Sequence, residues 1–314
     1  MKQNYNIADF MAIQRNSWPL ADQNFAALSQ VRERSFQFDG FVVKAQFNPE
    51  RIRSSAAKTD QATIAQRPCF LCQAHRPAEQ RALDFRGRYE LLVNPYPIFH
   101  QHLTIVDYQH RPQLIAGRLP DLLDLARELS GFTIFYNGPQ CGASAPDHFH
   151  FQAAPRNAMP VDTDAERFLQ GKGEILIQSS ATSVVAAPPG YLRQLLVFQS
   201  TKREELTQLV EQAISFLPQQ AEHDEPMLNI LANFNNNCWQ IMLFPRQKQR
   251  PDQYFAEGDD QLLMSPASVE MGGLAILPRY EDFNKISRDD LADILEQVSL
   301  DKAIFEEIKQ KLAP

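Results

Sequence analysis

Short apolar runs separated by polar turns recur along the chain and predict a series of strands. Residues 36–47, "FQFDGFVVKAQF", predict two strands that turn at Asp39-Gly40, because Asp-Gly is a strong hairpin signal. The stretch 174–180 predicts an edge strand. The remaining predicted strands lie within residues 89–108 (two strands), 132–137, 191–199, 227–234, 238–246 and 272–279.

Helical spacing appears in a few segments only. Between Pro120 and Leu129 the apolar side chains recur every three or four residues; Pro120 suits a first helical turn and Gly131 an end. Further helices are predicted at 203–217, 287–298 with Ser287 as the cap, and 300–312. Residues 155–173 are polar and predict irregular structure.

The order of these elements indicates an α+β protein built from two related halves. Each half contains a helix and several strands joined by hairpin-length turns, which favours an antiparallel sheet with helices against it. No sequence identity links the halves, so the similarity is one of element order. We expect a catalytic N-terminal half at 1–185 and a second half at 186–314 without catalytic histidines, with a homodimer as an option.

Composition narrows the functional classes. Hydrophobic residues make up 44 % and charged residues 22 %, as in ordinary globular proteins. The formal net charge of −7 disfavours a nucleic-acid partner, and no apolar run is long enough to span a membrane. The N-terminus has no apolar segment typical of a signal peptide, so we expect a cytoplasmic protein.

The segment "DHFHFQ" carries the most specific chemistry. In a strand, His148, His150 and Gln152 would share one face at spacings of about 6.6 Å, while Phe149 and Phe151 would face the core. Two imidazoles on one face can share a metal ion, or one can bind metal while the other performs chemistry. The alternative is that these are ordinary surface histidines, but the His-x-His-x-Gln pattern makes this alternative the weaker one.

A second cluster lies in "RPCFLCQAHRP". Cys69 and Cys72 have the spacing of two thiolates on one zinc ion, which requires two further ligands. A redox dithiol is the alternative, but the proline and polar residues that follow disfavour a thioredoxin-like motif. Spacing alone does not choose the remaining ligands among the nearby histidines, which are His75, His100, His102 and His110.

Three segments together resemble the histidine-triad superfamily. They are "NPYPIFHQHLTIVDYQHRPQL", "FTIFYNGPQCGASAPDHFHFQA" and "SPASVEMGGLAILPRYEDF". More narrowly, they resemble the branch that contains galactose-1-phosphate uridylyltransferase, diadenosine tetraphosphate phosphorylase and the GDP-hexose phosphorylases. The resemblance covers most of residues 40–290, and its histidine block is most similar to the GDP-hexose phosphorylases.

The resemblance implies a role for each residue of the histidine block and the cysteine pair. His150 would attack the α-phosphorus of a nucleotide and form a covalent nucleotidyl-histidine, and Gln152 would donate a hydrogen bond to the transferred group. In the uridylyltransferases the first histidine joins a Cys-x-x-Cys pair and one more histidine on a structural zinc ion. The matching positions here are Cys69, Cys72, His110 and His148.

Phosphate groups also need positive charge and hydrogen-bond donors. The candidates are Arg51, Arg53 and Lys58, in a segment that corresponds loosely to a phosphate-contacting segment of the uridylyltransferases, together with Asn137 and Ser144. The substrate implied is a nucleoside diphosphate sugar, with phosphate or a sugar 1-phosphate as acceptor. The alternatives are a dinucleoside polyphosphate phosphorylase or hydrolase, and a non-catalytic nucleotide-binding protein.

Overall fold

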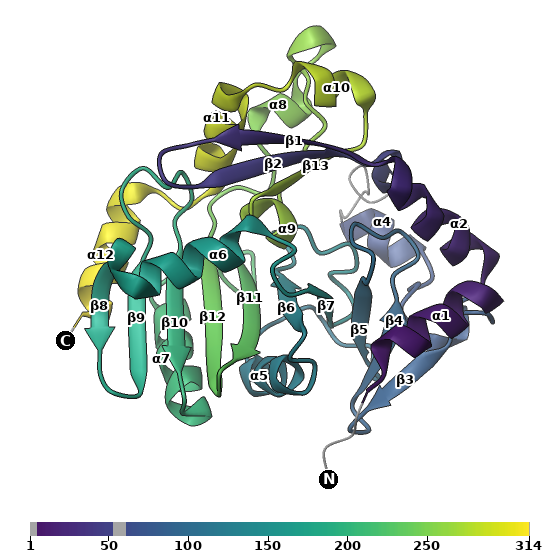
Figure 1. Ribbon diagram of the computed structural model, residues 1–314, viewed down its shortest axis with the longest axis horizontal. Coiled ribbons are helices and arrows are strands. Elements are labelled where there is room, and N and C mark those ends of the chain that lie inside the picture. The colour runs from purple at the N-terminus through teal and green to yellow at the C-terminus, as the bar shows by residue number, and fades with distance from the viewer. Residues whose placement is uncertain (1–4, 53–60, 314) are drawn as a thin grey trace.

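The main body of the protein is one antiparallel sheet of ten strands, in the order β3-β4-β5-β7-β6-β11-β12-β10-β9-β8 (Figure 1). The structure is a computed structural model and describes residues 5–52 and 61–313. The predicted α+β class is confirmed. The strands are β3 Ala82–Phe85, β4 Tyr89–Val93, β5 Leu103–Asp107, β6 Phe132–Asn137, β7 His150–Pro155, β8 Glu174–Gln178, β9 Thr182–Ala186, β10 Leu196–Ser200, β11 Leu228–Asn235 and β12 Cys238–Pro245.

The two halves of this sheet have the same topology. Counted along the chain, each half has the order first-second-third-fifth-fourth from its outer edge inward, β3-β4-β5-β7-β6 and β8-β9-β10-β12-β11. A helix follows the third strand in each half, α5 (Leu119–Glu128) and α7 (Arg203–Ser215). The halves join where β6 pairs with β11. The boundary predicted between residues 185 and 186 stays a proposal, and the topology groups β8 and β9 with the second half.

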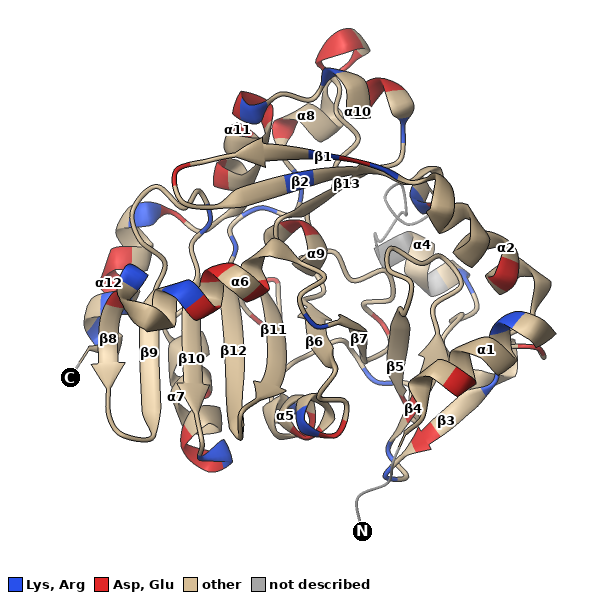
Figure 2. Cartoon of the chain, viewed as in Figure 1, with Lys and Arg blue, Asp and Glu red and all other residues tan. Residues whose placement is uncertain are grey.

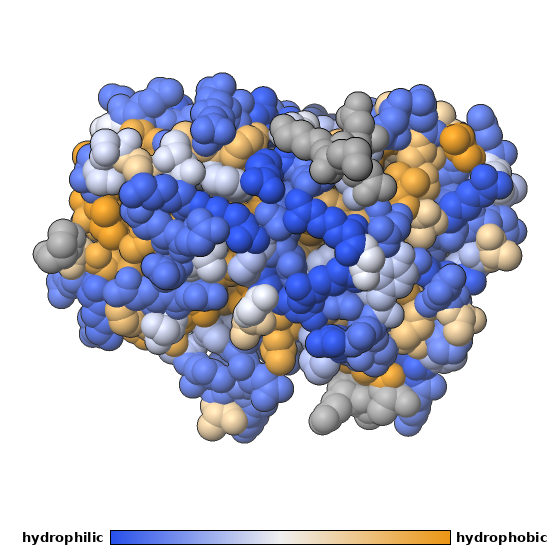
Figure 3. All heavy atoms as spheres, turned by 90° about the horizontal axis from the view of Figure 1, so that it is seen from below, coloured by the Kyte–Doolittle hydropathy of each residue, from blue (hydrophilic) through white to orange (hydrophobic). Residues whose placement is uncertain are grey.

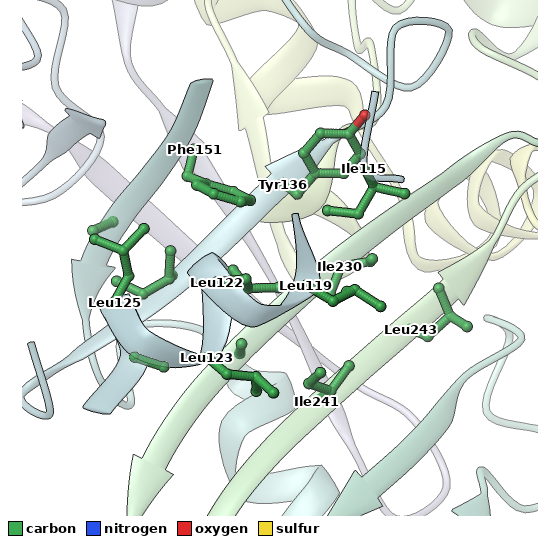
Figure 4. Close-up of a cluster of buried hydrophobic side chains, with 14 of the residues drawn as sticks. Ile115, Leu119, Leu122, Leu123, Leu125, Tyr136, Phe151, Ile230, Ile241 and Leu243 are labelled. Carbon is green, nitrogen blue, oxygen red and sulfur yellow. The ribbon is translucent and has the colours of Figure 1, made fainter. Parts of the chain in front are cut away.

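One face of the sheet is covered by α5, α7 and α12 (Lys302–Leu312), all of which are amphipathic. Leu119, Leu122 and Leu123 of α5 are buried against Ile230, Ile241 and other side chains of β11 and β12 (Figure 4). Full burial of one such leucine stabilises the fold by about 1.5–3 kcal/mol. Phe149 and Phe151 belong to this same cluster, so their predicted position in the core is confirmed.

The opposite face carries a second apolar cluster beneath a small sheet of three strands, β1-β2-β13 (Figure 1). β1 (Arg32–Gln37) and β2 (Val42–Phe47) form the predicted hairpin, and Gly40 at its turn has φ +81°. β13 (Leu274–Leu277) was expected to belong to the antiparallel sheet of the second half. It instead pairs in parallel with β2, so the last strand of the chain lies beside a strand from its N-terminal part.

Two segments differ from the sequence prediction. Residues 155–173 were expected to be irregular, but they contain α6 (Pro160–Arg167) and the wide turn η4 (Phe168–Lys172), since Val161 and Ala165 give the helix one apolar side. The N-terminal helices α1 (Ile7–Ser17) and α2 (Pro19–Ala27) were not predicted. They bury apolar residues, among them Ile7, Phe10, Met11 and Phe25, against the end of the sheet near β3 and β4 (Figure 1).

The remaining elements are short, apart from the helix α11 (Arg288–Val298), which has 11 residues. They are η1 Leu28–Gln30, η2 Pro49–Arg51, α4 Gln61–Gln66, η3 Gln73–His75, α8 Asp252–Phe255, η5 Gly258–Asp260, α9 Ser268–Met271, α10 Tyr280–Lys285 and α11 Arg288–Val298. Ser287 accepts a hydrogen bond from the backbone of Asp290, which confirms the predicted cap of α11.

Charged residues lie mainly on the helices and loops, and the central strands of the large sheet carry few of them (Figure 2). The face seen from below is mostly hydrophilic, with apolar atoms exposed in separate patches (Figure 3). Among the described residues, no helix is both long and apolar enough to cross a membrane.

Candidate active site and metal centre

The candidate site lies where β7 begins. The loop of residues 138–149 leads from β6 into β7, and the strand starts at His150, two residues later than the expected strand that included His148. His150 and Gln152 share the parity of Ala154, which packs on the face below the small sheet, whereas Phe149 and Phe151 point to the other face. The predicted alternation therefore holds for His150 and Gln152, and His148 lies in the turn before them.

A hydrogen bond to a nearby backbone carbonyl holds the His150 ring in one tautomer. Its Nδ1 lies 2.9 Å from the carbonyl oxygen of His148, which can only accept, so Nδ1 carries the proton and Nε2 carries a lone pair. Burial lowers the pKa of His150 to about 4, against the opposing effect of that hydrogen bond. The imidazole is therefore neutral at pH 7, as a nitrogen nucleophile must be.

Gln152 is oriented by a histidine whose role the sequence analysis did not identify. Nδ1 of His102 accepts from the backbone N–H of Ile98 (3.2 Å), so its Nε2 is protonated and donates to Oε1 of Gln152 (3.0 Å). This bond leaves the Gln152 amide nitrogen to donate elsewhere. Burial, with a smaller contribution from Arg51, lowers the pKa of His102 to about 3, so the ring stays neutral.

A compact group of four side chains lies beside the histidine strand. One ligand atom from each of Cys69, Cys72, His110 and His148 lies within 4.8 Å of all the others. Nδ1 of His148 is 3.3 Å from Sγ of Cys69 and 3.5 Å from Sγ of Cys72, and Nδ1 of His110 is 3.3 Å from Sγ of Cys72. These are the four positions that the resemblance implied for a zinc ion.

The donor chemistry of this group fits a divalent cation. Nε2 of His148 donates to the carbonyl oxygen of Asp107 (2.9 Å), which leaves Nδ1 unprotonated toward the two sulfurs. Desolvation and the neighbouring Cys69 raise the pKa of Cys72 to about 11, so a bound cation would be needed to hold Cys72 as a thiolate at neutral pH. Two sulfurs and two imidazole nitrogens form a common structural zinc set.

The other nearby histidines do not join the cluster. Nδ1 of His75 donates to the carbonyl oxygen of Cys69 (3.1 Å), and His102 is committed to Gln152. The carboxylate of Asp147, next to His148, contacts the other two ligand segments, because it accepts from Arg67 at 2.8 Å and lies 3.8 Å from Nε2 of His110. Neither Arg67 nor Asp147 was singled out in the sequence.

Of the predicted phosphate-binding residues, Arg51 lies near the site, and Arg53 and Lys58 lie outside the described residues. Arg51 donates to the carbonyl oxygen of Tyr96 (2.7 Å), and its charge acts on the titration of His102. Burial lowers the pKa of Arg51 to about 10, although nearby Glu270 opposes the shift. The guanidinium is still positively charged at neutral pH.

Asn137 and Ser144 have different environments. Oδ1 of Asn137 accepts from Nδ2 of Asn229 (3.0 Å) and from the backbone N–H of Ser268 (2.8 Å), so this oxygen joins the two halves. Ser144 lies half-buried in the loop before His148. Gly142 in the same loop has φ +95°, and a Cβ atom there would clash with Ala267. The segment before α9 therefore lies directly against the loop that leads to His150.

Comparison with known families gives two matches that together cover most of the chain. Residues 10–155 match a domain of unknown function (DUF4922), and residues 174–313 match the C-terminal domain of GDPGP1-like proteins. No curated protein matches the chain.

Solved structures extend this result to the fold. Yeast Ap4A phosphorylase Apa2 superposes with a TM-score of 0.56 at 17 % identity, over 91 % of this chain and 97 % of that one. Its complex with Ap4A gives a TM-score of 0.54, again at 17 % identity over 91 % and 97 % of the two chains. The shared fold and the match of the C-terminal half agree with the resemblance of the histidine block. The second half of the chain therefore matches the C-terminal domain of GDPGP1-like proteins, and the chain as a whole has a fold similar to that of yeast Ap4A phosphorylase Apa2.

Proposed function

We propose that this protein is a nucleotidyltransferase of the phosphorylase or hexose-1-phosphate uridylyltransferase type, with His150 as its nucleophile. The observation that supports this most directly is the state of the His150 ring: neutral, buried, and protonated on Nδ1 by its bond to the His148 carbonyl. That arrangement presents an unprotonated Nε2 at the start of a strand. His102 and His148, by comparison, both use their two ring nitrogens in contacts within the protein.

The reaction divides into two displacements. Nε2 of His150 forms a bond to the α-phosphorus of the nucleotide, and the bond from that phosphorus to the bridging oxygen breaks, which releases a sugar 1-phosphate. An oxygen of inorganic phosphate or of a second sugar 1-phosphate then attacks the same phosphorus and frees the histidine. Gln152 donates from its amide nitrogen to the transferred group, and Arg51 contributes positive charge.

The metal group has a supporting role in this proposal. Cys69, Cys72, His110 and His148 would hold one zinc ion, and four protein ligands leave no position for substrate. The ion would stabilise the turn before β7, because His148 lies two residues from His150. The four ligands themselves take no part in the displacement.

A nucleoside diphosphate sugar is the proposed substrate class, because the histidine block is most similar to the GDP-hexose phosphorylases. A dinucleoside polyphosphate is the second candidate. It is favoured by the likeness over the whole chain to yeast Ap4A phosphorylase, which has been solved with AMP and with Ap4A. In that reaction the first leaving group would be a nucleoside triphosphate rather than a sugar phosphate.

The test is covalent trapping. The protein is incubated with α-³²P-labelled GDP-glucose, ADP-glucose, UDP-glucose or Ap4A, and the adduct is isolated under denaturing conditions. A phosphorus–nitrogen adduct should be lost in acid and stable in base. His150→Ala should remove the label and keep the fold, whereas His223→Ala, a change in the loop before β11, should keep both.

Turnover then distinguishes the substrate classes. With unlabelled phosphate present, release of a nucleoside diphosphate from one sugar nucleotide supports the first candidate, and its release from Ap4A supports the second. Label that survives His150→Ala contradicts the nucleophile assignment. No label from any of the four nucleotides, with the zinc site loaded, would favour a non-catalytic nucleotide-binding protein.

A further inference from the structure

The ladder between β6 and β7 stops beside the proposed nucleophile. The two strands pair from Phe132 and Pro155 up to Phe135 and Gln152. In the same register, the next residues on this face would be Asn137 and His150. These two are not paired with each other, although both are still assigned to their strands.

A side-chain amide bridges the two strands at this place. Gln113, which is fully buried, accepts from the backbone N–H of His150 (2.8 Å) through its Oε1. Its Nε2 donates to the carbonyl oxygens of His150 (2.9 Å) and of Asn137 (3.0 Å). The amide thus satisfies three backbone groups that would otherwise be buried without partners. Gln113 substitutes for the missing pair of the ladder and keeps the strands apart.

Gln113 is itself held from both halves of the protein. Its backbone N–H donates to Pro146 O (3.0 Å), and its carbonyl accepts from the Tyr136 hydroxyl (3.0 Å). Oε1 of Glu225, from the loop before β11, lies 2.6 Å from the same hydroxyl, whose single proton is shared between the two acceptors, and Oε2 of Glu225 accepts from the backbone N–H of Ile115 (2.7 Å). Figure 4 shows Ile115 beside the oxygen-bearing end of the Tyr136 ring.

We propose that Gln113 is a positioning residue for His150. By fixing both the N–H and the carbonyl of His150, it sets the orientation of the two peptide groups on either side of the Cα atom from which the ring projects. That orientation keeps Nδ1 of His150 in reach of the His148 carbonyl and thereby keeps the lone pair on Nε2. The kinetic part of this inference rests on the proposed function, whereas the effect on the ring does not.

The first measurement determines the tautomer of the His150 imidazole and needs no substrate. Two-bond ¹H–¹⁵N spectra of the zinc-loaded, histidine-labelled full chain report which nitrogen of each imidazole is protonated, and His150→Ala identifies the His150 signals. We expect one tautomer, protonated on Nδ1, in the unaltered protein. Gln113→Met removes all three bonds at nearly constant volume and should give a mixture that includes the Nε2-protonated form.

The chain offers a matched control. Gln14 on α1 is equally buried, donates to the carbonyl of Glu79 (2.6 Å) and accepts from the N–H of Arg81 (2.7 Å). Gln14→Met should lower the melting temperature without changing the His150 tautomer. Gln113→Asn and Gln14→Asn, which keep an amide but shorten its reach, form a second pair if the methionine variants fold poorly.

Covalent labelling provides the second measurement. A misplacement of about 1 Å costs on the order of 100-fold in rate, so labelling of Gln113→Met should slow by that order while Gln14→Met stays within about twofold. An unchanged His150 tautomer in folded Gln113→Met or Gln113→Asn would overturn the inference, as would failure of both Gln113 variants to fold while the Gln14 pair folds. A tautomer change in a protein that no nucleotide labels would refute the proposed function alone.

Discussion

Two substitutions of His102 separate its contribution to stability from its contribution to chemistry. In an asparagine the amide oxygen takes a place close to that of Nδ1, so His102→Asn can still accept from the N–H of Ile98. In a glutamine the amide nitrogen takes a place close to that of Nε2, so His102→Gln can still donate to Gln152. Each variant therefore keeps one of the two bonds that the structure shows.

The magnitudes follow from what each variant leaves without a partner. His102→Gln strands the N–H of Ile98, a residue only 6 % exposed, and an orphaned buried donor costs about 1–3 kcal/mol. His102→Asn loses one neutral hydrogen bond to a half-buried amide, about 0.5–1.5 kcal/mol. If that bond orients Gln152 toward the transferred phosphoryl group, the same energy slows labelling by roughly 2- to 13-fold in His102→Asn.

Urea unfolding and the rate of covalent labelling are measured on both variants. We expect His102→Gln to be the less stable and to label at nearly the unaltered rate, and His102→Asn to be the more stable and to label more slowly. The opposite ranking of labelling rates, or equal rates in both, would refute the argument that His102 acts through Gln152. Gln152→Ala should label slowly, and adding His102→Asn to it should cause little further loss.

Four other predictions follow from single features. Elemental analysis should find about one zinc per chain, lost on Cys69→Ser together with several degrees of melting temperature; a metal-free protein of equal stability would contradict this. The pKa of His150 is lowered to about 4, so its labelling rate should stay level from pH 8 to 5 and fall near pH 4. In the unfolded chain the same histidine takes up a proton near pH 6.5. The free energy of unfolding that this residue contributes should therefore fall as the pH is lowered from 6.5 toward 4. Burial raises the pKa of Glu225 to about 7, so its ionisation lowers the stability of the fold as the pH rises from 4.5 to 7. Glu225→Gln can still form hydrogen bonds with Tyr136 and Ile115. In thermal unfolding, this variant should be more stable than the unaltered chain at pH 8 and no more stable at pH 4. Leu122→Ala in the core of α5 should cost about 2–5 kcal/mol in urea unfolding, and a loss below 1 kcal/mol would contradict the packing described.

The repeated topology gives the second half a defined relation to the site. The second half carries no histidine at the start of β12, the position at which β7 of the first half carries the proposed nucleophile His150. It contributes instead through contacts with the first half: Asn229 and Ser268 bond Asn137, Ala267 lies against Gly142, and Glu225 supports the segment of Gln113. We propose that the second half supports the catalytic half and contributes no nucleophile of its own.

Local patterns in the sequence determined a large part of this structure. Alternation over residues 148–152 placed His150 and Gln152 on one face and the two phenylalanines in the core, and Asp39-Gly40 marked the hairpin of β1 and β2. Side-chain alternation, turn residues and helical spacing act between residues a few positions apart, so they can be read from the chain directly. The two-residue gap between Cys69 and Cys72 is a local signal of the same kind, and it indicated a metal-binding pair.

The tertiary structure decided which distant residues meet these patterns. His102 lies 50 residues before its partner Gln152, Gln113 lies 37 before His150, and Glu225 lies 110 after Ile115. No periodicity marks these residues, because a buried histidine, glutamine or glutamate is distinguished only by the backbone groups that the fold brings to it. The parallel pairing of β13 with β2 could not be predicted for the same reason, because the sequence of a short apolar strand does not indicate which strand it pairs with.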